Sequence, residues 1–324
     1  MGKSLITGVD IHPNGVVAVT LQLDKRGYSL IGYQAWMTPA DIVTDFHANK
    51  HQELVKRLKK LKRTLSLFHR KIAMVLDDSA VFSKSIELET TLSPYELTTR
   101  LHQDFAPHSP LPIDELYLDY VEPRRSGDER GGVYQVYAAK KRMVDQRTQL
   151  AAESGLRLAI IDIERQALIH LLLHSQQYMQ GKHGFLIAVR HSTLSFCCIA
   201  CHDEAFFKQI PLAVLRLSSK EQVAELSRKI KREFALFRAN FPQTAIGGVW
   251  VMADHAETTR VLQQAVDDQH SFTCEVLQPL AMVDRSLVTA TKSEQQAGVD
   301  QGVFGVAFGA ALRGLTAIEN GYAA

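Results

Sequence analysis

The sequence lacks a long apolar run, and its net charge is close to zero. No window approaches the roughly 20 apolar residues that a transmembrane helix requires, so we expect any membrane association to be indirect. The N-terminal stretch has no apolar core followed by a small-residue cleavage site, so we expect no secretory signal peptide. Lys and Arg number 37 against 35 Asp and Glu, a net charge of +2. This balance provides no strong field for nucleic acid, and we expect no nucleic-acid partner.

Common catalytic signatures and cysteine pairs are also missing. There is no G-x-S-x-G, H-E-x-x-H, Walker A or Rossmann glycine pattern, so no catalytic residue is predicted. Of the four cysteines, three fall in FCCIACHDE at 196–204. If this stretch is a strand, alternation points Cys198 away from Cys197 and Cys201, and no second ligand pair follows. We expect reduced core cysteines and no metal site.

What remains is the composition of a globular α/β protein, with 46% hydrophobic and 22% charged residues. The 324 residues are enough for two lobes. Three strand-like runs open the chain, followed by an amphipathic helix and the apolar strand KIAMVL at 71–76. The same order returns from residue 181. The pattern predicts a first lobe of residues 1–80 with 138–180, and a second lobe of residues 181–324.

Residues 81–137 interrupt the first lobe with a different pattern. The strand VFSKSIEL is followed by a helix, for which Ser93 is the expected N-cap and Pro94 the first residue. A proline-rich break and two strands, ELYLDYV and VYQVYAA, complete the segment. This order predicts a small inserted subdomain with one sheet and one helix. Gly155 is the expected stop of the next helix.

Four stretches, in order, resemble the type IV pilus assembly protein PilM family. They are GVDI at 8–11, VFSKSIELETTLSPYEL with ELYLDY within 81–120, YAAKKRMVDQRTQLAAESGLRLAIIDIERQAL at 137–168, and GVAFGAALRGL at 305–315. The third contains a strand end of the form Asp-x-Glu, and the fourth is a helix rich in small residues. The resemblance, which includes HofM-like members, implies an actin-like (ribonuclease-H-like) two-lobed α/β fold with an inserted subdomain, as in PilM and FtsA.

The resemblance also implies a partner and a location. In this family, the cytoplasmic N-terminal peptide of the membrane protein PilN binds a groove between the inserted subdomain and the first lobe. A PilN-like bitopic protein is therefore the expected partner, with other pilus platform or motor proteins as further candidates, and the location is cytoplasmic, peripheral to the inner membrane. The candidate groove residues are Phe82, Ile86, Leu88, Leu101 and Phe105. Strand alternation puts Phe82 and Ile86 on one face, so part of this set is expected to fill the subdomain's own core.

Actin-like proteins bind nucleotide with two glycine-rich hairpin loops, whose amides hold the phosphates. The first loop here keeps Asp10, but His12 replaces the expected glycine and Pro13 removes an N–H donor. Asn14 follows in the same loop, and Val17 stands where a Lys is expected. For Asp10 we expect a turn-stabilising carboxylate rather than a metal ligand.

The other two loops of the nucleotide site are changed as well. Arg190 replaces the expected glycine of the second loop, where it would still meet an anion as a guanidinium fork. The adenine-side loop has Ala253-Asp254 in place of a glycine pair. The resulting nucleotide-site remnant comprises Asp10, His12, Asn14, Arg190, Ser192 and Asp254.

These changes predict weak or absent binding of ATP and Mg²⁺, and no cofactor is expected. The predicted function is a scaffold of an inner-membrane platform in a type IV pilus or a related DNA-uptake or secretion system. Two alternatives are an active actin-like ATP-binding protein that couples nucleotide state to pilus assembly, and a cytoplasmic module like that of the general secretion protein GspL. A sugar kinase or another phosphotransferase would need the intact phosphate loops that are missing.

The helix expected within 51–71 carries many Lys and Arg residues opposite its leucines. Basic amphipathic helices of this kind bind anionic membrane surfaces. The pattern also fits the solvated outer face of a lobe helix, and we favour this second interpretation. Charge reversal of Lys56, Lys59, Lys60 and Arg63 is then expected to leave liposome binding unchanged.

Overall fold

The chain forms two compact units in the computed structural model, Met1–Val75 with Ala151–Ala324, and Leu76–Leu150. The larger unit contains the predicted second lobe and most of the predicted first lobe, whereas the smaller unit contains the predicted insertion together with residues 76–80 and 138–150. The structure describes residues 3–13, 15–37, 48–65, 70–89, 92–121, 131–176, 183–190, 193–200, 205–212, 220–267, 273–288, 293–294 and 300–321.

The first lobe is built on a six-stranded sheet with the order β14-β3-β2-β1-β4-β8. Its strands are β1 (Ser4–His12), β2 (Gly15–Asp24), β3 (Gly27–Met37), β4 (Lys71–Leu76), β8 (Arg157–Ile163) and β14 (Ser293–Glu294). Strands β1, β2 and β3 are antiparallel neighbours, and β4 runs parallel to β1. Helix α1 (Ala48–Thr64) lies between β3 and β4 in the chain, with Leu54, Leu58 and Leu61 buried, as their spacing predicts.

The second lobe repeats this plan on a five-stranded sheet with the order β11-β10-β9-β12-β13. Its strands are β9 (His183–Arg190), β10 (Thr193–Ile199), β11 (Ala205–Pro211), β12 (Ile246–Ala253) and β13 (Cys274–Val276). Strands β9, β10 and β11 are antiparallel neighbours, and β12 runs parallel to β9 as β4 does to β1. Helix α5 (Lys220–Asn240) precedes β12, and α6 (Ala256–Asp267) follows it. The internal repeat predicted from the sequence is therefore present.

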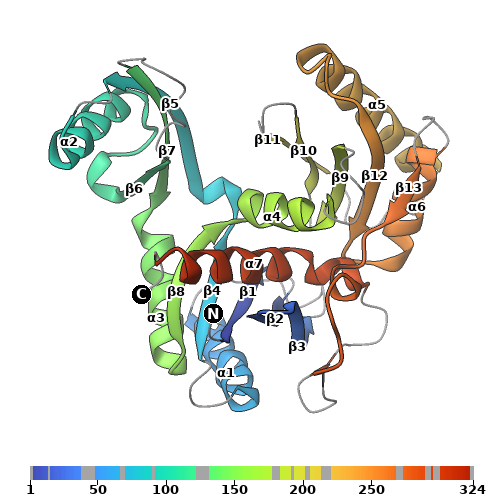
Figure 1. The fold of residues 1–324 in the computed structure, drawn as a ribbon, viewed down its shortest axis with the longest axis horizontal. Coiled ribbons are helices and arrows are strands. Elements are labelled where there is room, and N and C mark those ends of the chain that lie inside the picture. The colour runs from blue at the N-terminus through green and yellow to red at the C-terminus, as the bar shows by residue number, and fades with distance from the viewer. Residues whose placement is uncertain are drawn as a thin grey trace. The chain divides into compact units, whose positions relative to one another are not determined.

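Two helices lie between these sheets. Helix α7 (Gly305–Glu319) packs along β1 and β2, helix α4 (Glu164–Gln176) contacts β9 and β10, and the two helices pack on each other (Figure 1). One apolar cluster joins residues of both sheets and both helices, including Ile6, Leu186 and Phe308. The main core of the larger unit is therefore shared between the lobes.

Glycine allows α7 to approach its neighbours closely. A Cβ at Gly8 would lie 2.6 Å from Ala311 N and closer still to Ala307 O, while a Cβ at Gly309 would lie 2.6 Å from the carbonyl carbon of Ala167. These are backbone atoms, which cannot rotate away as a flexible side chain can. The small residues of GVDI and of GVAFGAALRGL therefore have a packing role.

The segment that contains α7 also resembles a membrane span by composition. Gln301–Glu319, which comprises the 3₁₀ turn η8 (Gln301–Phe304) and α7, is long and apolar enough to cross a membrane by length and composition alone. This corrects the expectation that no window qualifies. In the structure, 78% of that window is buried inside the protein, so the segment is a core helix.

The smaller unit is one three-stranded antiparallel sheet, with the order β5-β7-β6, and helix α2 (Figure 1). Its elements are β5 (Val81–Glu89), α2 (Pro94–Phe105), β6 (Leu116–Val121) and β7 (Gly131–Lys140). Ser93 caps α2 as predicted: its side chain accepts from Glu96 N, and the Glu96 carboxylate accepts from Ser93 N at 2.9 Å. The insertion therefore has the predicted strand, helix, strand, strand order.

This unit extends beyond the 81–137 expected from the sequence. Most of helix α3 (Lys141–Ser154) belongs to it. One contact that links α3 to the small sheet is the 3.1 Å hydrogen bond that Tyr117 of β6 donates to Asp145. Gly155, with a φ of 67°, ends α3 as predicted.

Candidate functional site

Four charged residues lie at the carboxyl ends of strands from both lobes of the larger unit. Asp10 is near the end of β1, Arg190 ends β9, Asp254 directly follows β12, and Glu164 begins α4 directly after β8. In open α/β sheets, ligands bind outside the carboxyl ends of parallel strands. This edge is therefore the place where a ligand between the two lobes would be expected.

Arg190 brings the four residues together. Its Nη1 donates to Glu164 Oε1 at 2.6 Å, its Nη2 donates to Asp10 Oδ2, and its Nε lies 3.8 Å from Asp254 Oδ1. Asp10 and Glu164 belong to the first lobe, whereas Arg190 and Asp254 belong to the second. We call these four residues the arginine cage. The guanidinium joins the two lobes through ion pairs.

The arginine cage has little contact with solvent. Arg190 is 1% exposed, and its three carboxylate partners are 5–6% exposed. Burial alone would lower the pKa of Arg190, but the charges of Asp10, Glu164 and Asp254 outweigh it and raise that pKa above its ordinary value. The side chain therefore stays charged throughout the pH range of a folded protein. Such buried charges are tolerated only when they are paired and hydrogen-bonded.

Two tight hairpins present the strand ends that form the cage. In the first lobe His12 pairs with Gly15, and in the second lobe Arg190 pairs with Thr193. Each pairing leaves only two positions for the turn, as in the shortest β-hairpins. The Thr193 hydroxyl also donates to the Arg190 carbonyl at 3.0 Å. The two lobes therefore contribute equivalent hairpins to one site.

The loop that carries Asp254 is fixed by the segment leading into α7. The backbone N–H of Asp300 donates to the Asp254 carbonyl at 3.3 Å, and the Asp300 carboxylate accepts from the Thr259 hydroxyl at 2.7 Å. A Cβ at Gly302 would lie 2.9 Å from Ala253 N, so this segment packs tightly on the end of β12. The position of Asp254 is thus set by the core helix segment as well as by its own strand.

The structure brings together three members of the predicted nucleotide-site remnant: Asp10, Arg190 and Asp254. Asp10 pairs with Arg190 of the second lobe, a contact that the sequence did not predict. The sequence predicted that Arg190 would meet an anion, and the anions that it contacts are carboxylates of the same chain, Asp10 and Glu164. His12 is buried at the end of β1, with 8% exposure. Asn14 and Ser192 lie outside the described residues.

Glu164 belongs to the cage but not to the predicted remnant. Its sequence signal is its place in the Asp-x-Glu stretch, directly after a strand. Asp162 of the same stretch serves another site: its Oδ1 accepts from Ile163 N at 2.9 Å, and its Oδ2 lies 3.7 Å from Arg313. Burial raises the pKa of Asp162. The two carboxylates of one motif therefore have different environments.

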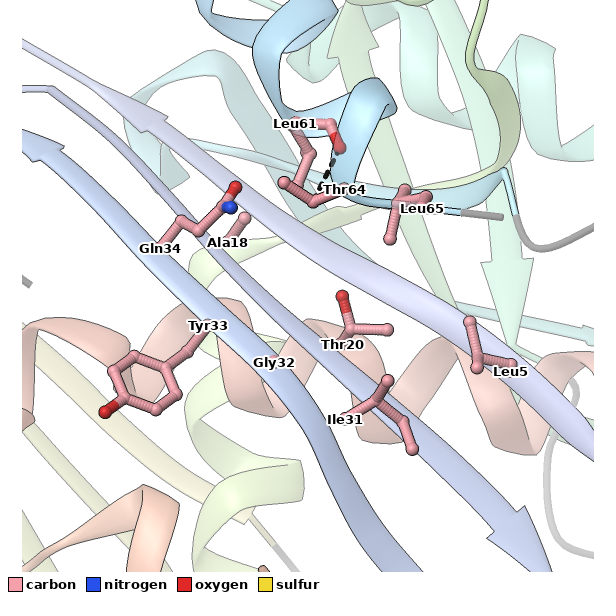
Figure 2. A pocket seen from close by; sticks show the side chains of 10 residues that line it. All are labelled: Leu5, Ala18, Thr20, Ile31, Gly32, Tyr33, Gln34, Leu61, Thr64 and Leu65. Atoms are coloured by element: carbon pink, nitrogen blue, oxygen red, sulfur yellow. Dashed lines mark hydrogen bonds between the residues drawn. The ribbon is translucent and has the colours of Figure 1, made fainter. Parts of the chain in front are cut away.

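Two hollows in the described part of the chain lie away from the cage. One of about 40 Å³, between the first sheet and α1, is lined by residues that include Thr20 and Leu61 (Figure 2). It has room for a few water molecules and not for a nucleotide. The other, of about 520 Å³, lies on the smaller unit beside the end of β5 and α2, where Glu89 and Tyr95 contribute to its lining. Neither is lined by Arg190.

The residues predicted to bind a partner lie mainly in the core of the smaller unit. Ile86, Leu88, Leu101 and Phe105 are 2–9% exposed and pack against one another. Phe82 is only partly buried, at the margin of this cluster. Of the five, Phe82 therefore keeps the most surface for a partner.

The cysteines of β10 behave as alternation predicts. Cys197 packs in the cluster between the sheets, and Cys198 packs in the separate cluster that includes α5. Burial raises the pKa of the Cys197 thiol. Cys201 and His202 lie outside the described residues. Among the residues that the structure describes, no group of three His, Cys, Asp or Glu side chains is arranged to hold a metal ion.

Two solved structures and one family model are similar to this chain. The solved PilM–PilN type IV pilus biogenesis complex superposes with a TM-score of 0.69 at 16% identity, over 96% of this chain and 98% of that chain. The cytoplasmic domain of EpsL, an inner-membrane component of the type II secretion system of Vibrio cholerae, has a TM-score of 0.50 at 8% identity, over 96% and 95%. These likenesses show the fold, which is the actin-like two-lobed fold with an inserted subdomain. The family model described as type IV pilus assembly protein PilM matches residues 8–199, more than half of the sequence. The chain therefore belongs to the type IV pilus assembly protein PilM family.

Proposed function

We propose that this protein is a cytoplasmic scaffold of a type IV pilus assembly platform, peripheral to the inner membrane, and that it works without ATP hydrolysis. Its family supports the role in pilus assembly. The arginine cage carries the rest of the proposal, because the chain's own charges fill the site at which a nucleotide would be expected.

A nucleotide would meet unfavourable charges at this site. Phosphate sites offer free amides, helix N-termini or accessible cations. Here the guanidinium of Arg190 is already paired with Asp10 and Glu164 and is 1% exposed. An entering polyphosphate would have to break both pairs and then lie beside three carboxylates. Breaking buried pairs and placing like charges together are each costly, which favours an empty nucleotide site.

Recruitment, we infer, uses the cytoplasmic N-terminal peptide of a PilN-like bitopic membrane protein. The similar complex pairs PilM with PilN. Cytoplasmic segments next to a membrane span are enriched in Lys and Arg. Residues 76–150 hold nine Lys and Arg against thirteen Asp and Glu, so the smaller unit is acidic although the whole chain is not. β5 is an edge strand of its sheet and carries Phe82, which suits a peptide that binds by strand addition or through an apolar contact.

Peptide binding tests this proposal. Fluorescence anisotropy would compare labelled cytoplasmic tails of the PilN-like protein and of a type II secretion membrane protein from the same cell. We expect binding of the PilN-like tail, at least about tenfold weaker for Phe82→Ala. Ser83→Ala is the matched control, since Ser83 lies next to Phe82 on the opposite, exposed face of β5. Binding of neither tail would contradict the scaffold role, and preference for the secretion tail would support the GspL-like alternative.

Calorimetric titration with Mg-ATP tests the nucleotide part separately. We expect no binding heat. A micromolar dissociation constant for Mg-ATP would refute the proposal that the site binds no nucleotide. It would not affect the proposal that a PilN-like protein recruits the chain.

A further inference from the structure

We propose that the arginine cage is a guanidinium-binding site that the chain occupies with its own Arg190, and that this occupancy holds the two lobes together in place of a ligand. The site is the one invoked for the absence of nucleotide, but the inference needs no pilus partner and is tested without one.

The three carboxylates are arranged around a fork. Glu164 and Asp10 accept hydrogen bonds from Nη1 and Nη2 of Arg190, and Asp254 lies beside Nε at 3.8 Å, close enough for an ion pair but not for a hydrogen bond. A planar guanidinium presents donors in several fixed directions, whereas an ammonium is a compact point charge. The cage therefore matches the shape of a guanidinium as well as its charge.

The cage connects parts of the chain that are distant in sequence. Asp10 and Arg190 are 180 residues apart and belong to different sheets. Arg190 is the last residue of β9, and the backbone carbonyl of Asp254 accepts a hydrogen bond from Asp300 N. The backbone of both residues is therefore fixed by its neighbours. Removal of the guanidinium would leave carboxylates from both lobes facing one another, and their repulsion would loosen the contact between the lobes.

A small metal ion does not fit the same arrangement. The described residues contain no trio of His, Cys, Asp or Glu placed to hold one, since these carboxylates are spaced around a larger planar group. Mg²⁺ demands close, near-octahedral oxygen ligands. An emptied cage is therefore expected to prefer guanidinium over Mg²⁺.

Chemical rescue of Arg190→Ala tests the proposal. We expect the Tm of the variant to fall by about 6–20 °C, the shift for a broken buried ion pair in a unit of this size. Guanidinium chloride at about 10 mM, far below denaturing concentrations, should restore part of this loss. Equal concentrations of NaCl or MgCl₂ should not, and the wild type should not respond. The double variant Arg190→Ala/Glu164→Gln should lose the rescue, because one arm of the site is gone.

Several results would overturn the proposal. An unchanged Tm in Arg190→Ala would show that the cage does not hold the lobes. Equal recovery in NaCl would reduce the effect to screening, and recovery in MgCl₂ alone would make the site a metal site.

A second variant covers the case in which Arg190→Ala does not fold. Arg190→Lys keeps the charge but loses the fork. We expect it to fold with a lower Tm and with faster hydrogen exchange at the ends of β1 and β9, while exchange in β5 and β7 of the smaller unit stays unchanged. Wild-type stability and exchange in Arg190→Lys would refute the role of the guanidinium shape.

Discussion

Gly8 is the position at which a single methyl group should do most damage to the larger unit. In Gly8→Ala the new Cβ would lie 2.6 Å from Ala311 N and closer still to Ala307 O, whereas ordinary contacts begin at 3.4 Å. Both atoms belong to the backbone of α7, so the helix or β1 must move by about 1 Å, enough to forfeit a quarter to a half of the dispersion energy of the contacts it opens. Eleven residues of α7 are buried, so many contacts are affected.

The cost follows from this geometry. Overpacked cores lose about 1–3 kcal/mol, and we place Gly8→Ala at or above about 3 kcal/mol because the clash is with two backbone atoms. For a unit of this size, that corresponds to a Tm lower by about 6–12 °C. Since Gly8 is two residues from Asp10, displacement of β1 should also accelerate hydrogen exchange at the arginine cage.

Differential scanning calorimetry of Gly8→Ala and of a matched variant measures this effect. Gly131→Ala is the control, because a Cβ at Gly131 would lie no closer than 3.7 Å, to the Glu87 side chain. We expect its Tm to change by no more than about 2 °C. If Gly8→Ala were as stable as Gly131→Ala, the backbones of β1 and α7 could not be in the close contact described above.

Three further predictions concern a helix cap and two buried titratable groups. Ser93→Ala removes the capping box of α2, and urea unfolding should show a loss of about 1 kcal/mol. Burial lowers the pKa of His174, so its contribution is present above the unfolded value of about 6.5 and is lost as the pH falls through the lower folded value. His174→Phe should flatten the stability curve between pH 7 and pH 5, and an unchanged slope would contradict this. Burial raises the pKa of Asp162, so its contribution is present at low pH and is lost as the pH rises. Asp162→Asn, which keeps an acceptor for Ile163 N, should therefore be at least as stable as the wild type at pH 7, with the advantage disappearing towards pH 4; lower stability at pH 7 would refute this.

Most of the helices and strands could be predicted because they depend on patterns among residues that are close in sequence. The leucine spacing of α1, the apolar run of β4 and the Ser93 cap of α2 all depend on residues within a few positions of one another. The two-lobe repeat and the insertion follow from the order of these elements. The limits of the smaller unit could not be predicted in this way, since they depend on contacts between residues distant in sequence, of which the hydrogen bond between Tyr117 and Asp145 is one.

The candidate site was predictable only as a set of altered loops. Sequence comparison with the expected loops shows that the glycines and amides for phosphate binding are replaced, and it identifies Asp10, Arg190 and Asp254 among the candidate residues. That these three residues join Glu164 in one buried cage could be seen only in the folded chain. The physical reason is that charges brought together from the ends of four strands in two sheets pair according to how the sheets and α7 pack, and no local pattern records that packing.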